Sequence, residues 1–422
     1  MHVTSVIDGT RFARAAATRQ AILDAATDLF CRNGYRFVSL RDIAAEAGIT
    51  HPALLKHFAG KEELLGQVAR RLDASAAAAA TPPDALPFAA TAHRQDAVPG
   101  HAALFAALTG EASAPSHPLH EWMRDRASEL RARRAEALAA GVDSGLVAAD
   151  RSVEDEALRL TAAWDGLRML QQYLRDRVDV AATLDRHQEL IARPLGWREP
   201  GTHPATHPLP PAPPLPPIAE EPSAAETGYR TGRERRAKIV DGAMTLFARE
   251  GYGDTSLLDI ATRVGVSKSA LYHHFSSKDA LLHEVMRERD RRIDDRGTPD
   301  AGASAADVLR SFADGAATNE AEQPGLIELY AVISSEATPR THDAHAYFEH
   351  RFAVALDGFA TLLRAAADDG VLPPHRDPDH EALWLLALWD GLQYQWLYDH
   401  DTVDVAAQLR AHFADILPET RS

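Results

Sequence analysis

The sequence predicts an all-α protein built from two similar units. Segments with apolar residues at helical spacing dominate, for example 156–173 and 381–398. No succession of alternating strands bounded by tight turns is present. The chain also repeats itself, because 22–65 align without a gap to 239–282, with roughly 21 of 44 positions identical. We therefore expect a duplicated helical unit.

The duplication continues into the later part of each half, but at a different offset. The early blocks are 217 positions apart, whereas 164–167 and 178–182 recur 225 positions later, at 389–392 and 403–407. The second half therefore carries about eight extra residues between its two matching blocks. Each half thus consists of an early and a late part.

Composition excludes several classes of protein. The 422 residues are 45% hydrophobic and 25% charged, which is typical of a folded globular chain. No apolar window is long enough to cross a membrane, no secretory signal is visible, and Cys31 is the single cysteine, so we expect a cytoplasmic protein. Phosphate-binding loops, hydrolase motifs and zinc-protease motifs are absent, and we expect neither an enzyme nor a bound cofactor.

Two segments of biased composition mark boundaries. About ten of the thirty residues in 198–227 are proline, which predicts a semi-rigid polyproline II linker, with an SH3-type ligand as the alternative. An alanine run followed by prolines at 74–87 predicts the end of a helix. The expected domains are an early domain at 16–76 and a late domain at 77–197 in the first half, the linker at 198–227, and an early domain at 233–293 and a late domain at 294–422 in the second half.

The early part of each half has the start and stop signals of three short helices. In the second copy, apolar residues within 239–247 form one helical stripe, and Gly251 is placed to end that helix in the left-handed conformation. Ser256 and Asp259 form a capping pair for the next helix. Gly265 then breaks the chain before a further helix. This order of elements predicts a helix-turn-helix.

The third helix of each copy carries the candidate binding side chains. Ser267 is placed to cap a helix over 268–275, and Thr50 to cap one over 51–58. We expect Leu271 and Phe275 to face inward. The side chains left on the outer face have the hydrogen-bonding groups that contact phosphates and base edges, namely Lys268, Ser269, Tyr272 and His273.

Charge is concentrated where these helices lie. The chain is acidic overall, with a net charge of −16, yet 11–71 and 228–292 each carry +4, which leaves −24 for the remainder. A basic head on an acidic body directs DNA to the head and repels it elsewhere. The alternative, solvated faces of an unrelated helical bundle, does not explain two copies with matching caps and turns.

The segment 265–282, together with Gly251-Tyr252 and 259–261 upstream, resembles the signature of the TetR/AcrR transcriptional regulators. The resemblance covers both halves, most strongly 18–70 and 235–290. It implies that 16–76 and 233–293 are three-helix DNA-binding domains, and that 77–197 and 294–422 are larger helical regulatory domains that bind a small-molecule effector and dimerise. Members usually act as homodimers that repress transcription and leave double-stranded operator DNA when the effector binds.

The resemblance also implies roles for individual residues. In the second copy, Tyr272 and Lys278 would contact phosphates, and Lys268, Ser269 and His273 would lie nearest the bases, with Ser267 at the start of the helix. The first copy departs from the pattern, because Leu55 stands where the family usually has tyrosine and Pro52 replaces a small residue. The DNA-binding residues that we expect in the first copy are Thr50, His51, Pro52, Lys56 and Lys61.

The late parts, 100–197 and 325–420, resemble the regulatory domain of the family. Aromatic residues concentrate in the second one, which we therefore expect to be the sensor. Most would be core or interface residues, and a minority would line an apolar effector pocket. The candidate effector-binding residues are Tyr330, Phe348, Phe352, Trp384, Trp389 and Tyr394.

Two histidine pairs have the spacing of metal ligands. His117 and His120 correspond to His342 and His345 at the offset of 225. A proline follows His117 and no third ligand stands at an obvious spacing, so we interpret the pairs as residues at helix starts and expect no metal.

The function predicted from the sequence is a tandem repressor in which one polypeptide supplies both halves of the usual dimer and reads an asymmetric operator. A homodimer of whole chains, with four DNA-binding heads, is the first alternative. The second is a ligand-binding or interaction module whose heads no longer bind DNA, which Leu55 makes conceivable for the first half.

Overall fold

A computed structural model describes residues 3–76, 85–202, 209–214, 230–294 and 302–418. These residues form helices and connecting turns, and no strand is found among them. The all-α prediction is confirmed. The alanine run at 77–80 and the linker residues 203–208 and 215–229 lie outside the described residues.

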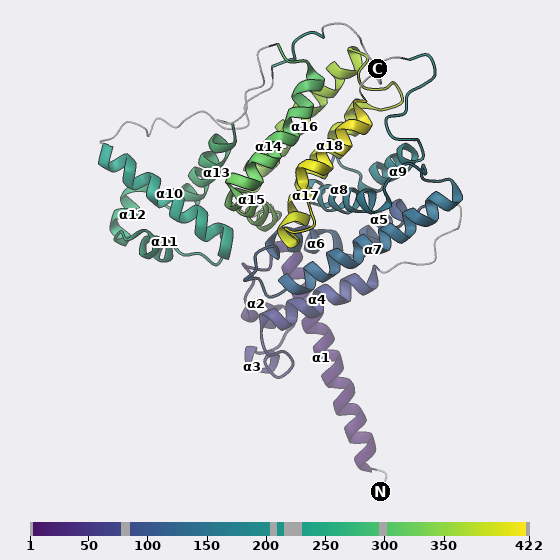
Figure 1. Ribbon diagram of the computed structural model, residues 1–422. Coiled ribbons are helices and arrows are strands. Elements are labelled where there is room, and N and C mark those ends of the chain that lie inside the picture. The colour runs from purple at the N-terminus through teal and green to yellow at the C-terminus, as the bar shows by residue number, and fades with distance from the viewer. Residues whose placement is uncertain (1–2, 77–84, 203–208, 215–229, 295–301, 419–422) are drawn as a thin grey trace.

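The helices fall into two sets of the same order, shown in Figure 1. In the first half the first head comprises α1 Val3–Asn33, α2 Leu40–Glu46, α3 His51–Leu54 and α4 Lys61–Ser75, and the first body comprises α5 Phe88–Ala97, α6 His101–Glu111, α7 His120–Ser144, α8 Val153–Tyr173 and α9 Val180–Ile191. In the second half the second head comprises α10 Arg230–Glu250, α11 Leu257–Val264, α12 Lys268–His274 and α13 Lys278–Asp294, and the second body comprises α14 Ala305–Glu322, α15 Pro324–Glu336, α16 His345–Asp368, α17 Pro378–Tyr398 and α18 Val405–Ile416.

Local sequence explains how each head begins and ends its helices. Ser39 and Ser256 each accept from the backbone amide three residues on, and the aspartate at that position accepts a hydrogen bond from the serine amide in return. Gly34 and Gly251 both lie in the left-handed region, at φ 81° and 80°, where a side chain would be strained. These caps and turns were predicted and are confirmed.

The third helix of the first head differs from its prediction. We expected Thr50 to cap a helix over 51–58, but its side chain makes no capping hydrogen bond and α3 ends at Leu54. In the second head Ser267 accepts from the Ala270 amide, and α12 continues to His274. The uncapped start leaves one more helix donor without a side-chain acceptor, which is consistent with the shorter helix.

The two bodies pack against each other through equivalent helices, α8 and α17. A Cβ atom on Gly166 would lie 1.9 Å from the carbonyl oxygen of Ala387, and one on Gly391 would lie 1.7 Å from that of Ala162. Since 166 matches 391 and 162 matches 387 in the repeat, the contact is reciprocal. Glycine on both sides lets the two backbones touch.

The apolar core does not divide at the repeat boundary. The second head shares one continuous cluster with both bodies, whereas the first head forms its own cluster with α6, α7 and Tyr398 from α17. The Tyr398 hydroxyl donates to the carbonyl of Thr109, 2.9 Å away. The halves are therefore joined by core packing as well as by the linker.

Part of the proline-rich linker lies against the second body. Leu209 and Ala212 pack on the main core, and the Ala212 amide donates to the carbonyl of Ala303 at 2.7 Å. The linker also contacts the second body at its start, where Arg198 donates to the carbonyl of Gly370 at 3.2 Å. Within the described residues, no helix is long and apolar enough to cross a membrane.

Candidate functional site

The third helix of the second head presents a polar face. Leu271 and Phe275 are buried beneath α12, as predicted. The opposite side exposes Ser267, Lys268, Ser269, Tyr272 and His273. Tyr272 is 46% exposed, which is unusual for a large aromatic residue, and the Lys268 ammonium lies 5.7 Å from the centre of its ring. This face combines a cation, hydroxyls and an imidazole on one short helix.

An arginine that the sequence analysis did not single out holds this helix in place. The Arg236 guanidinium stacks 4.2 Å from the Phe275 ring centre, donates to the carbonyl of His274 at 3.0 Å and pairs with Glu284 at 3.1 Å. In the first head Arg19 lies 4.2 Å over Phe58 and donates to the carbonyl of His57, and a hydrogen bond to Gln67 takes the place of the ion pair. The two arginines match at the offset of 217, just upstream of the aligned block, which was the signal available in the sequence.

The first head presents a more apolar face. Thr50, Pro52 and Lys56 are exposed and His51 is half-buried. Leu55, which replaces the tyrosine, is 44% exposed. No described contact covers it. The two heads therefore offer different chemistry at equivalent positions.

Two of the candidate DNA-binding lysines lie apart from the others. Lys61 and Lys278, at the starts of α4 and α13, are half-buried, and their ammonium groups lie 4.3 and 4.2 Å from the ring centres of Tyr35 and Tyr252. The Lys61 ammonium also donates to the carbonyl of Arg36 at 3.2 Å. Burial lowers the pKa of both lysines. The structure thus joins them to the turn that follows the first helix of each head.

The candidate effector-binding aromatics do not form one site. Tyr330, Phe348 and Phe352 contact one another inside the second body, where Tyr173 of the first half joins them. Trp389 lies elsewhere and packs on Phe312 and Phe359. Tyr394 is buried near the Ser334 hydroxyl. Of the six candidates, Trp384 lines a cavity that the structure describes.

The two histidine pairs lie at or just before the starts of α7 and α16. The Nδ1 atoms of His117 and His342 accept from the amides of Leu119 and Ala344. His120 and His345 are the first residues of α7 and α16. Among the described residues, no group of three or more metal-ligating side chains is placed to hold an ion.

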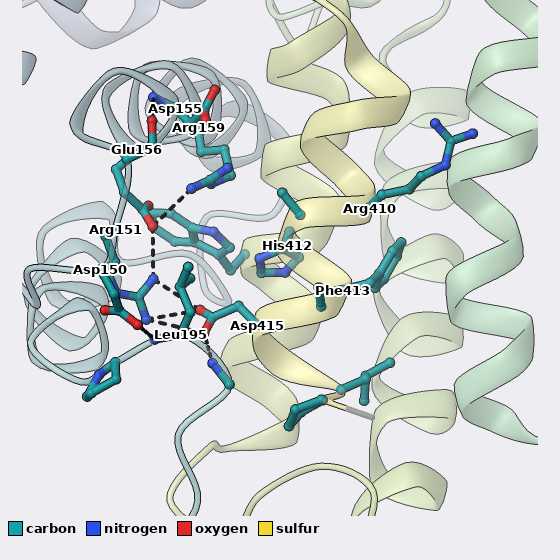
Figure 2. A pocket seen from close by; sticks show the side chains of 18 of the residues that line it. Asp150, Arg151, Asp155, Glu156, Arg159, Leu195, Arg410, His412, Phe413 and Asp415 are labelled. Atoms are coloured by element: carbon teal, nitrogen blue, oxygen red, sulfur yellow. Dashed lines mark hydrogen bonds and ion pairs between the residues drawn. The ribbon is translucent and has the colours of Figure 1, made fainter. Parts of the chain in front are cut away.

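A cavity of about 1200 Å³ lies at the junction of the two bodies, and we call it the seam cavity. Figure 2 shows residues from α8 on one side of it and residues of α18 on the other. Trp384 stacks on His187 of the first half, with ring centres 3.5 Å apart. Both halves therefore contribute to the lining. The lining residues are Asp150, Arg151, Ser152, Asp155, Glu156, Arg159, His187, Pro194, Leu195, Gly196, Arg198, Thr202, Arg310, Asp314, Trp384, Arg410, Ala411, His412, Phe413, Ala414, Asp415, Leu417 and Pro418.

Ion pairs neutralise much of the charge in the seam cavity. Arg151 pairs with Glu156 at 2.8 Å and with Asp415 at 3.2 Å, and Arg159 pairs with Glu156 at 2.9 Å. His412, in contrast, points from α18 toward the first half (Figure 2) and has an Nε2 atom without a hydrogen-bond partner among the described residues. Burial lowers the pKa of His412 to about 4, so its imidazole is neutral near pH 7.

Comparison with known proteins identifies the family. The sequence profile of bacterial regulatory proteins, tetR family, matches both 22–68 and 239–285. The profile of the C-terminal domain of BetI-type transcriptional repressors matches 305–419. The chain belongs to the TetR family. It is a helix-turn-helix transcriptional regulator, and the family is not enzymatic.

Relatives in the TetR family are similar over less than half of this chain. The HTH-type transcriptional regulator SrpR of Pseudomonas putida is 28% identical over 170 residues, which are 40% of this chain and 78% of SrpR. The regulator TtgR, also of Pseudomonas putida, is 29% identical over 184 residues, 41% of this chain and 85% of TtgR. A putative regulator from Saccharomonospora viridis, solved with choline, is 26% identical, covers 43% of this chain and 95% of its own, and has a TM-score of 0.37.

Proposed function

We propose that this TetR-family chain acts as a covalent pseudo-dimer, a ligand-responsive repressor that binds one asymmetric operator. The observation that carries the proposal is the reciprocal contact of Gly166 with Ala387 and of Gly391 with Ala162. A two-fold dimer of single units makes this kind of self-complementary contact between equivalent surfaces. Here both surfaces belong to one polypeptide, and the tether keeps them at an effective concentration typically of millimolar order.

The difference between the two heads supports an asymmetric operator. Tyr272 offers a hydroxyl to a phosphate, whereas Leu55 at the equivalent position offers a hydrocarbon side chain. A hydrogen bond to a charged group is worth about 1.5–3 kcal/mol, so the second head should bind its half-site more tightly than the first. The two half-sites should also differ in sequence, because the second head has Lys268 and Ser269 at the positions where the first head has His51 and Pro52.

Selection from genomic or random DNA at moderate salt tests the proposal directly. The expected product is an imperfectly symmetric motif with half-sites about one helical turn apart. Light scattering on the purified protein should give one chain mass, both free and on that DNA. Two chain masses would establish the four-headed dimer instead. Salt-sensitive binding without any enriched motif would favour an interaction module with degenerate heads.

We further propose that the effector binds in the seam cavity. Its volume accommodates a drug-sized molecule, and a ligand that contacts both halves can alter how they are paired. Arg151, Glu156 and Asp415 in its lining pair with one another. The His412 imidazole, whose Nε2 atom has no hydrogen-bond partner among the described residues, is neutral near pH 7. We therefore expect a predominantly uncharged effector with a hydroxyl or carbonyl group that bonds to this imidazole.

Filling the cavity tests this placement. Ala414 lines the seam cavity, so Ala414→Trp should exclude the effector while the operator stays bound. Ala407 is exposed on the same helix and does not line the cavity, which makes Ala407→Trp the matched control. A small-molecule extract of the host culture should release the wild type and the control from DNA but not Ala414→Trp. Equal release of all three proteins would place the effector site elsewhere. Release of none of them would contradict the proposal that the repressor responds to a ligand.

A further inference from the structure

One arginine lies where the two heads and the two bodies meet. Arg36 follows the glycine turn of the first head, between α1 and α2, and its side chain is 5% exposed. The repeat places Gly253 at the equivalent position of the second head. The chain therefore has a single guanidinium at this junction instead of the two that a symmetric pair of heads would carry.

Arg36 contacts three other parts of the protein. Its Nε atom lies 3.3 Å from a carboxylate oxygen of Glu111 on α6 and 4.0 Å from one of Glu336 on α15. Its Nη1 atom donates to the carbonyl of Glu250 and to the carboxylate of Asp254, both in the second head. One side chain of the first head thus forms ion pairs with both bodies and hydrogen bonds with the opposite head.

Glu336 fixes the second head from the other side of this cluster. Its carboxylate accepts from the backbone amides of Tyr252 and Gly253, at the turn between α10 and α11. Glu111 and Glu336 are equivalent residues in the repeat, 225 positions apart, and both are buried. Burial raises the pKa of each of these carboxyl groups, and the Arg36 guanidinium is the largest influence that opposes this rise in both.

Packing around the cluster leaves no room for a second side chain. A Cβ atom on Gly253 would lie 2.7 Å from a carboxylate oxygen of Glu336 and 2.9 Å from the Cβ atom of Arg36. One on Gly251 would lie 2.6 Å from the Arg36 guanidinium carbon. Arginine in the first head therefore requires glycine in the second. The two turns therefore fit together, with the arginine side chain of one lying against the glycines of the other.

Further contacts cross between the halves at the same place. The Phe37 ring meets that of His342 edge-on, with centres 5.4 Å apart. The Ser116 hydroxyl of the first body donates to the carbonyl of Arg249 in the second head at 2.8 Å. Each head is thus held against the body of the other half. Because each turn leads directly into α2 or α11, a shift of either turn would move the helix-turn-helix behind it.

We propose that Arg36 is a positioning residue that fixes the separation of the two recognition helices, α3 and α12, and so determines which half-site spacing the protein accepts. This inference rests on the proposed function, because it requires both heads to bind one operator. Without the guanidinium, the two heads lose the side chain that joins them, while the surfaces that contact DNA are unchanged.

The test is binding to a set of operators in which the selected half-sites are separated by spacers that differ in steps of one base pair. The wild type should prefer one spacing. Arg36→Met keeps an unbranched apolar stem and removes the guanidinium, and we expect the preference of this variant over the neighbouring spacings to fall by about tenfold, a typical coupling between sites. Its affinity for a single half-site should not change.

Two further variants separate positioning from folding. Arg36→Met combined with Glu111→Gln also removes one of the two buried carboxylates that lose the guanidinium, so this variant should unfold at a higher temperature than Arg36→Met and still lose the spacing preference. Arg32→Ala is the matched control, because Arg32 lies near the end of α1, is exposed, and pairs with Glu46 inside its own head. That variant should keep the wild-type profile.

The outcomes are distinct. A folded Arg36→Met protein with the wild-type spacing profile would overturn the inference, as would an equal loss of affinity for single half-sites and for every spacing. A wild type that shows no preferred spacing would instead refute the proposed pseudo-dimer on which the inference rests.

Discussion

Replacement of Gly391 by alanine should force the two bodies apart. The new Cβ atom would lie 1.7 Å from the carbonyl oxygen of Ala162, whereas real Cβ contacts essentially never fall below 3.0 Å. The helices α8 and α17 must therefore separate locally by roughly 1.3 Å, the difference between these two distances. The clash is with backbone, which no rotamer change can relieve. Overpacking of this kind costs about 1–3 kcal/mol, and we expect at least that loss.

Urea unfolding measures this loss, and the chain supplies a matched control. Gly315 lies exposed within α14, and a Cβ atom there would meet nothing within 4 Å. Gly315→Ala should therefore stabilise the protein by roughly 0.5–1 kcal/mol through helix propensity. Gly166→Ala should act like Gly391→Ala, and the double variant should lose less than the sum, because one separation relieves both clashes.

Operator binding provides the second readout of the same variants. If α8 and α17 pair the two halves for DNA binding, Gly391→Ala should bind the selected operator more weakly while it binds isolated half-sites normally. Stability of Gly391→Ala within about 0.5 kcal/mol of the wild type would refute the close packing of α8 on α17, since surface changes without structural effect fall in that range.

Three further predictions concern the heads and one buried histidine. Lys268→Ala combined with Tyr272→Ala should abolish operator binding, which titrations at several salt concentrations will show; unchanged binding would contradict the assignment of the second head. Leu55→Tyr should add a phosphate contact to the first head and raise operator affinity roughly tenfold or more in the same assay, and no gain would mean that this position faces away from DNA. His101 has no hydrogen-bond partner for either ring nitrogen among the described residues, and burial lowers its pKa to about 4, below its ordinary value of 6.5. As the pH falls from 6.5 to 4, the unfolded chain binds a proton at His101 before the folded protein does, so His101 destabilises the fold in that range. His101→Phe should therefore raise the free energy of unfolding by about 2 kcal/mol more at pH 5 than at pH 7, as measured by urea unfolding. The exposed His93 provides the control, since His93→Phe should leave the pH dependence unchanged.

The heads could be predicted well because their signals are local. Each signal depends on residues within one or two turns of the chain. Glycine at a left-handed position ends a helix, a serine followed three residues later by aspartate begins one, and an apolar residue such as Leu271 marks its buried side. Thr50 shows the limit of such reasoning. A threonine at an N-cap position satisfies the sequence rule, yet its hydroxyl caps nothing in the structure.

The candidate effector site could not be predicted, because aromatic content does not reveal what packs against what. Tyr330 and Phe348 fill the core together with Tyr173 from the other half, and Trp389 packs elsewhere. The seam cavity gathers residues from both halves, more than 200 positions apart in some pairs, such as Arg151 and Asp415. Its lining is largely polar and comes from both bodies, whereas the sequence predicted an apolar pocket within one body.

The sequence alone determined the duplication, the helical fold and the family, because helix caps, turn glycines and apolar periodicity are short-range properties that each copy repeats. Only the tertiary structure decided how the copies meet. Gly166 and Gly391 are unremarkable within their own helices, and Arg36 is one basic residue among many until the fold brings it beside Glu111 and Glu336. Contacts between halves depend on which surfaces come together in space, and no local signal in either copy specifies that partner.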